Sequence, residues 1–279
     1  MSNNDLPIIV NPWKLAFWGC FLLMSLHAQN PGPDFVRAHI TVAPDPFTRT
    51  VSGEVRYEFT TTEFMDSIYL DAQRMQFERV ELDGSDIGYS SKGGKLVIRG
   101  PIKIGRHELF VSYKASPKQT IYFFGWEDEI EGNEQIWTQG QGKDSSHWVP
   151  VVDRMDEKVE FDLSILFDSA YQVIANGKLL YKSAEGSLSR WDFDMDNPMS
   201  SYLLAFAVGR YDYLEEESGS GIPMKLYYPT QQDNKAKWTY LHSKNIFDFI
   251  EADIGIPYPW GDYKQVPVVD FLYAGMENT

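Results

Sequence analysis

Cysteine is almost absent from this sequence: Cys20 is the only one in 279 residues. It lies in an amino-terminal apolar stretch that reads as a removable leader, so the remainder has none. This absence excludes a disulfide framework, a cysteine nucleophile and a thiolate metal site. We therefore expect burial of apolar side chains to stabilise the fold, and a hydrophobic content of 43% is enough for a sizeable core.

Positive charge is also scarce. The chain has 25 Lys and Arg residues against 40 Asp and Glu residues, so its formal net charge is −15. A surface with this balance repels phosphate backbones, and a nucleic-acid partner is not expected.

Long hydrophobic runs are missing as well. The apolar run Leu15–Leu26 has twelve residues, fewer than the ~20 that a membrane-spanning helix needs. Lys14 supplies a positive flank and Ala28 a small residue at the expected cleavage point. Residues 1–28 are therefore predicted to be a secretory signal, which makes the protein exported and leaves no membrane span after cleavage.

Short segments rich in Val, Ile, Tyr and Phe alternate with turn residues at a spacing near ten, which favours an antiparallel sandwich or saddle. Asp83-Gly84 and Asn176-Gly177 are hairpin dipeptides. The expected strands are Phe35–Val42, Thr50–Thr61, Ser67–Leu70, Arg79–Leu82, Gly94–Ile98, Gly105–Tyr113, Thr120–Phe124, Lys158–Phe167, Tyr171–Leu180, Leu188–Asp194, Tyr202–Tyr213 and Pro223–Tyr228.

The pattern changes after residue 213. Leu214–Gly221 has the acidic, Ser- and Gly-rich composition of a linker. Thr230–Ile254 then shows a helical apolar stripe, with Thr230 as its expected cap, and Val266–Phe271 reads as a buried strand. The predicted fold class is mainly β, followed by the opening of an α+β unit that is too short to close a core of its own.

Four segments carry a resemblance. Ala274-Gly275-Met276-Glu277-Asn278 resembles the G-[AG]-M-E-N signature of the aminopeptidase N family of zinc metallopeptidases, with Ala274 in place of the first Gly. Ile256–Trp260 resembles the family's G-x-P-Y-P segment, Trp137–Gln141 its T-Q-[CFG]-[EQ] loop, and Leu203–Tyr211 the strand that closes its first domain. The order and spacing of these segments agree with the family's pattern across about 245 residues.

The resemblance implies a domain plan and a substrate. Residues 29–217 would be a saddle-like N-terminal β domain, and residues 218–279 the truncated start of a thermolysin-like catalytic domain. The substrates would be peptides with a free N-terminus.

The resemblance also implies a binding site for the substrate amine. Glu277 would pair with the ammonium group, a charge-assisted interaction, and Gln141 would add a neutral acceptor. Gln141 is preferred to its neighbour Gln139 because the family's residue is the last of the four in the loop. Gly275 would let the substrate backbone approach, and backbone groups of Ala274, Gly275 and Met276 would bind the peptide.

The zinc motif of the family is not in this sequence. An H-E-x-x-H helix would supply two ligands and a general base, but His107-Glu108 is followed by Val111 at the second His position. We therefore expect no metal ligand and no catalytic residue within the chain, with the zinc ligands beyond Thr279. The 279 residues alone are predicted to be inactive.

One alternative stays open at this point. A β-sandwich with 8 Trp and 16 Tyr residues could be an exported carbohydrate-binding or adhesion module without catalysis, if those aromatic rings are exposed. The Trp residues could equally line a cleft or fill the core.

Overall fold

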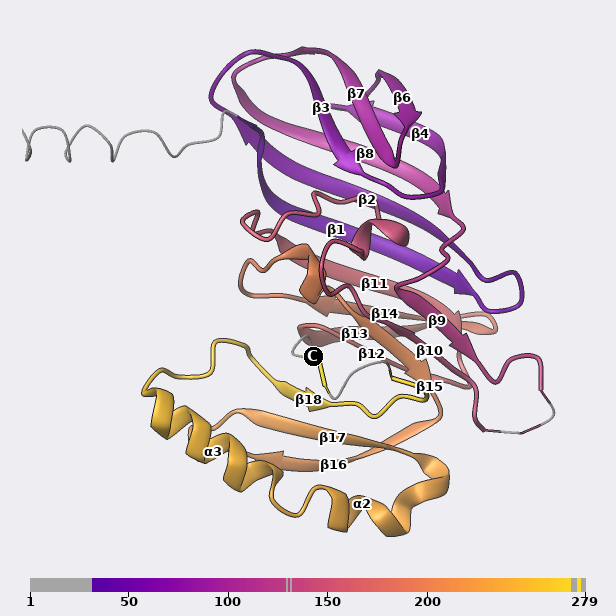
Figure 1. Ribbon diagram of the computed structural model, residues 1–279, viewed down its shortest axis with the longest axis vertical. Helices are drawn as coiled ribbons and strands as arrows, with labels where there is room; N and C mark the ends of the chain where they lie inside the picture. Colours follow the sequence, from indigo (N-terminus) through magenta and orange to yellow (C-terminus); the bar gives the residue numbers. More distant parts are fainter. Residues whose placement is uncertain (1–31, 129, 131, 272–274, 277–279) are drawn as a thin grey trace, which may run out of the picture. The chain divides into compact units, whose positions relative to one another are not determined.

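The computed structural model describes residues 32–128, 130, 132–271 and 275–276. The predicted signal, residues 1–28, lies outside them. The expected fold class, mainly β, is confirmed by four sheets (Figure 1). The largest has eight strands, in the order β13 (Lys178–Glu185), β14 (Leu188–Asp194), β11 (Glu160–Asp168), β1 (Asp34–Asp45), β2 (Thr50–Thr61), β8 (Gly105–Ala115), β4 (Met75–Leu82) and β5 (Ser85–Asp86).

The period of two in the sequence explains why these segments form strands. Along β1, Ala38, Ile40 and Val42 are buried while the residues between them are more exposed, because successive side chains of a strand point to opposite faces. β1 lies at the centre of the sheet. It pairs antiparallel with β2 and parallel with β11.

Two smaller sheets cover the apolar face of the large sheet. Their strands contribute Leu70, Ile98, Ile136 and Phe206 to the same continuous core as the large sheet. One sheet has the order β3 (Met65–Asp71), β7 (Lys95–Ile102) and β6 (Gly88–Lys92), and the other has the order β12 (Gln172–Ala175), β15 (Phe206–Gly209), β10 (Gln135–Thr138) and β9 (Ile121–Phe124).

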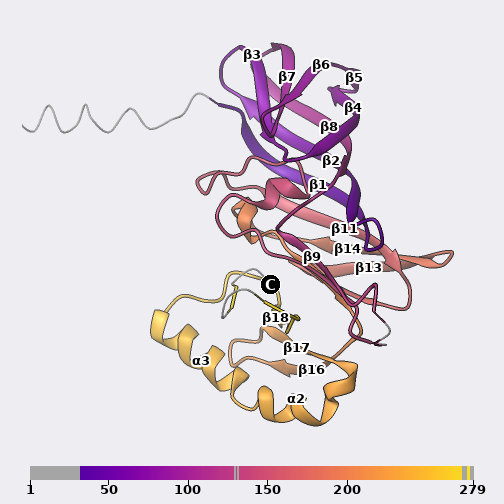
Figure 2. The same ribbon diagram turned by 45° about the vertical axis from the view of Figure 1, so that its right-hand side comes forward.

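The fourth sheet carries the helices. Tyr240, which follows α2 directly, and Phe247 of α3 pack onto Met224 and Leu226 of the sheet. Figure 2 shows the helices on the side of this sheet that is turned away from the eight-stranded sheet. The elements are β16 (Tyr211–Glu217), β17 (Pro223–Pro229) and β18 (Tyr263–Gln265), with α2 (Asp233–Thr239) and α3 (Ser243–Ile254); short 3-10 turns are η2 (Ser145–His147), η3 (Ser201–Leu203) and η4 (Thr230–Gln232).

The hairpin predicted at Asn176-Gly177 is wrong. β12 and β13 on either side belong to different sheets. The Asn176 side chain binds the backbone of residues 203–205 twice. Its Oδ1 accepts from Ala205 N, and its Nδ2 donates to Leu203 O at 3.0 Å. Gly177 has φ +77°, and a Cβ there would lie 2.2 Å from Asp194 O. The dipeptide therefore takes the chain from one sheet to the next.

The single helix predicted over Thr230–Ile254 is interrupted. α2 ends at Thr239 and α3 begins at Ser243, because the Tyr240 side chain turns into the core and its hydroxyl donates to Tyr227 O. The cap expected from Thr230 is not formed either, since no side chain caps η4 or α2. Gly255, in the left-handed conformation at φ 72°, ends α3 as predicted.

Two further expectations differ from the structure. Leu214–Glu217, expected in a linker, form the end of β16 and pair with β17. The buried strand expected over Val266–Phe271 is wrong, because β18 ends at Gln265 and Pro267 has no N–H to continue a ladder. Among the described residues, no helix combines the length and apolar character needed to cross a membrane.

Candidate functional site

The site is built on β10 and the loop that follows it. Gln135, Trp137 and Gln139 alternate along this segment and are all buried. Their alternation places them on one face of the chain, as in any strand. Thr138 faces the other way: its hydroxyl exchanges hydrogen bonds with Phe206 O at 3.4 Å and Phe206 N at 2.9 Å, which fixes β10 against β15.

The three alternating side chains all reach the carboxyl-terminal segment. Gln135 Oε1 accepts from Val269 N at 2.8 Å, and Trp137 Nε1 donates to Val269 O at 3.1 Å. Gln139 Nε2 lies 4.0 Å from Met276 Sδ and donates to Gln141 Oε1 at 3.2 Å. Gln139 of the predicted substrate loop and Met276 of the predicted signature segment therefore lie next to each other, although they are more than 130 residues apart in sequence.

A cavity of about 790 Å³ opens beside these contacts. Trp137 and Thr138 form one wall, and Gly275 and Met276 lie on its border. Most of the lining is apolar or aromatic, including Phe206, Tyr258, Trp260, Tyr263, Val266 and Phe271. Such a lining suits an apolar group with few polar contacts.

Lys264 lines the same cavity and is buried, with 4% of its side chain exposed. Burial lowers the pKa of its ammonium group, and the neighbouring Asp262 carboxylate opposes that shift. Nζ donates to Asp262 Oδ1 and to Gly177 O, both at 2.7 Å. The charge is therefore paired within the protein, and the lysine ties β18 to the turn between β12 and β13.

The structure places only some of the predicted site residues. Gln141 and Gly275 are exposed and Met276 is half-buried. Ala274 and Glu277 lie outside the described residues. Gln139, which sequence reasoning set aside in favour of Gln141, is the residue that contacts Met276. The alternation of Gln, Trp and Gln from position 135 to 139 is the signal that could have found it.

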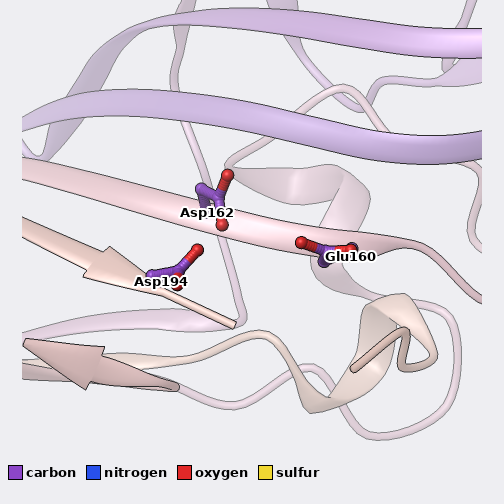
Figure 3. Close-up of side chains that lie close together, drawn as sticks. All are labelled: Glu160, Asp162 and Asp194. Carbon is purple, nitrogen blue, oxygen red and sulfur yellow. The ribbon is translucent and has the colours of Figure 1, made fainter. Parts of the chain in front are cut away.

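One group of three acidic side chains in the described part of the chain has oxygens within 4.8 Å of one another: Glu160, Asp162 and Asp194 (Figure 3). Arg37 occupies the group, with contacts of 3.1 Å to Glu160, 2.8 Å to Asp162 and 3.1 Å to Asp194. His39 Nδ1 adds a contact of 2.8 Å to Asp162. This is an ion-pair network joining β1, β11 and β14, and it does not fit a zinc site.

His107 does not fit a zinc site either. Its Nδ1 lies 2.8 Å from Asp83 Oδ2 and its Nε2 lies 2.7 Å from Lys103 O. Both neighbours are acceptors, so the ring satisfies both only when each nitrogen carries a proton. A protonated imidazole cannot bind a metal.

The exposed Trp rings that the glycan-binding alternative assumes are not found on the described β sheets, although Tyr69, Tyr89 and Tyr181 are exposed there. Trp148 and Trp191 are buried in the core, and Trp137 is buried beside the cavity. Trp126 is only partly buried and packs against the core. The Trp that is largely exposed in the described chain is Trp238, on α2. An aromatic platform of exposed Trp on the sandwich is therefore not formed.

Fold and site together define a β-sandwich module joined to an α/β segment, and residues of both line the cavity. Residues 34–203 match the Peptidase M1 N-terminal domain, and the chain belongs to that family.

Similar proteins carry related names. Glutamyl aminopeptidase of Bos taurus is 28% identical over 142 residues, which is 50% of this chain and 15% of that protein. Probable aminopeptidase 1 of Sulfurisphaera tokodaii is 24% identical over 76% of this chain and 27% of that protein. Leucyl aminopeptidase of Saccharolobus solfataricus is 21% identical over 83% of this chain and 29% of that protein. The chain thus spans less than a third of the length of these relatives.

Proposed function

We propose that this chain is the amino-terminal part of an exported, zinc-dependent aminopeptidase that removes the first residue from peptides. Its contribution is recognition of the substrate's free amine. One observation carries the proposal: Gln139 contacts both Gln141 and Met276, and other residues of the same two segments line one cavity, namely Trp137, Thr138, Gly275 and Met276. Membership of the Peptidase M1 N-terminal domain family supports it.

The proposed domain plan assigns residues 1–28 to the signal, 29–217 to the β domain and 218–279 to the start of the catalytic domain. The apolar surface of α3 supports the last of these, because Ile246, Phe249 and Ile254 are each more than half exposed. Exposed apolar patches of this kind mark surfaces that another part of a protein covers.

In the proposed site, the ammonium group of the substrate pairs with the Glu277 carboxylate, and the Gln141 side-chain oxygen accepts a further hydrogen bond. Gly275 has no side chain to obstruct the peptide, and among the described residues beyond its two neighbours no atom lies within 4 Å of where its Cβ would be. The resemblance places the family's zinc helix further along the chain than the signature segment, and the proposed zinc ligands lie beyond Thr279.

The test is Glu277→Gln in the complete protein, assayed with leucine p-nitroanilide. Losing a charge-assisted hydrogen bond of about 1.5–3 kcal/mol should lower kcat/KM roughly tenfold to a hundredfold, mostly through a higher KM. Glu108→Gln is the matched control, because Glu108 is a half-buried glutamate on β8 that pairs with Arg56. Equal kinetics in the two variants would refute the amine-binding role of Glu277.

A further inference from the structure

Val269 has an unusual set of hydrogen-bond partners. Its N–H and its C=O both bind side chains of β10, at 2.8 Å to Gln135 and 3.1 Å to Trp137. Backbone groups in sheets usually bind other backbone groups. Here two side chains of β10 take the place of a neighbouring strand. They bind within Val266–Phe271, the segment that the sequence predicted to be a strand itself.

Both side chains are held in place. The Trp137 ring stacks on Tyr122, with 4.2 Å between centroids, and lies 5.4 Å from the ring of Phe271. The backbone of Gln135 is fixed by Trp126, whose Nε1 donates to Gln135 O at 3.0 Å. Gln135 and Trp137 are 5% and 2% exposed. A side chain with so little freedom can define the position of the backbone it binds.

Val269 lies shortly before the signature segment in the sequence. Tyr211 adds a second attachment, because its hydroxyl donates to Pro267 O at 2.9 Å. At the other end of the segment, Gln139 contacts Met276. Pro267, Val269 and Met276 are therefore each attached to residues of the β strands or of the loop after β10, and β10 with this loop supplies three of the four attachments.

We propose that Gln135 and Trp137 are positioning residues: by binding both backbone groups of Val269, they set where Gly275 and Met276, which follow it in the proposed binding segment, stand relative to Gln139. This inference rests on the proposed function. Neither side chain needs to touch the substrate. A displacement of Val269 would move Gly275 and Met276 away from Gln139, and small misplacements of binding groups are costly.

The test uses Trp137→Phe in the complete protein, which keeps an aromatic ring and removes the indole N–H. The matched control is Trp148→Phe, since Trp148 is also buried but its Nε1 has no hydrogen-bond partner. We expect Trp137→Phe to raise KM for leucine p-nitroanilide about threefold to tenfold, the equivalent of one hydrogen bond, with kcat little changed. Trp148→Phe should leave KM unchanged.

A second variant covers the case in which Trp137→Phe fails to fold. Gln135→Met removes the acceptor of the Val269 amide, and we expect faster hydrogen exchange at Val269, by about tenfold or more, together with the same rise in KM. Gln135→Glu keeps an acceptor oxygen and should restore KM.

The outcomes separate the two proposals. Unchanged KM in Gln135→Met, with the expected loss in Glu277→Gln, would overturn the positioning role and leave the proposed function standing. A complete protein that does not hydrolyse leucine p-nitroanilide would overturn the proposed function instead. Faster exchange at Val269 without any change in KM would also refute the inference.

Discussion

Two histidines in the β domain have opposite environments. Burial opposes protonation of His107, but the Asp83 and Lys103 acceptors outweigh it and raise its pKa above 6.5. Burial lowers the pKa of His147 below 6.5, and Asp144 and Asp153 only partly offset it. These shifts imply opposite dependences of stability on pH.

His107 stabilises the fold most below pH 6.5, and this contribution is lost as the pH rises through its raised pKa. His147 acts in the reverse sense: as the pH falls below 6.5 the unfolded state takes up a proton that the folded state resists, so stability falls. We expect His107→Asn to destabilise more at pH 5.5 than at pH 8.5. His147→Phe should reduce the loss of folding stability between pH 7 and pH 5.5. Urea unfolding at these pH values measures the free energy of unfolding of both variants. If this free energy depended on pH in the same way in the two variants, the opposite pKa shifts of His107 and His147 would be contradicted.

At the level of single residues, the order of a motif names a loop but does not tell which of its amides contacts Met276. A motif names residue types in order, so Gln141 was chosen by its place in the loop. Which amide turns toward Met276 depends on the alternation of β10 and on burial, and Gln139 rather than Gln141 is buried there.

Secondary-structure elements were predictable where one face is buried and the other exposed. The ranges expected for β2 and β14 coincide with the structure, and those for β1, β8 and β11 differ only at their ends. Prediction failed where tertiary contacts decide the outcome. Asn176 binds a distant segment instead of closing a hairpin, and burial of Tyr240 breaks a helix that its sequence pattern would continue.

Among the described residues, nothing covers the apolar stripe of α3. Phe249 is 67% exposed, and Ile246 and Ile250 line a groove of about 360 Å³ between the helix and residues 256–259. In residues 29–279 alone, Phe249→Gln should change the free energy of unfolding by less than about 0.5 kcal/mol, as for surface sites generally.

In the complete protein the same substitution should cost about 2 kcal/mol or more, because burial would then be lost. Trp238→Gln on the exposed part of α2 is the comparison. Denaturant unfolding of both lengths measures the difference, and equal effects of Phe249→Gln in the two would argue against a covering domain.

For the molecule as a whole, zinc and catalysis are proposed to reside outside these residues. The carboxylates that cluster in the described chain are already paired with Arg37. Purified residues 29–279 should therefore contain no stoichiometric zinc by elemental analysis and should not hydrolyse aminoacyl anilides. The complete protein is the positive control. Zinc at one equivalent together with turnover in the short chain would refute this assignment.

The position of β1 has a consequence for biosynthesis. Its partner on one side, β2, follows directly, but the partner on the other side, β11, is translated more than a hundred residues later. Until the ribosome delivers β11, one edge of β1 remains open to pairing with other nascent chains. A chaperone that holds the emerging polypeptide unfolded would protect this edge, and the same unfolded state is the one that a secretion channel accepts.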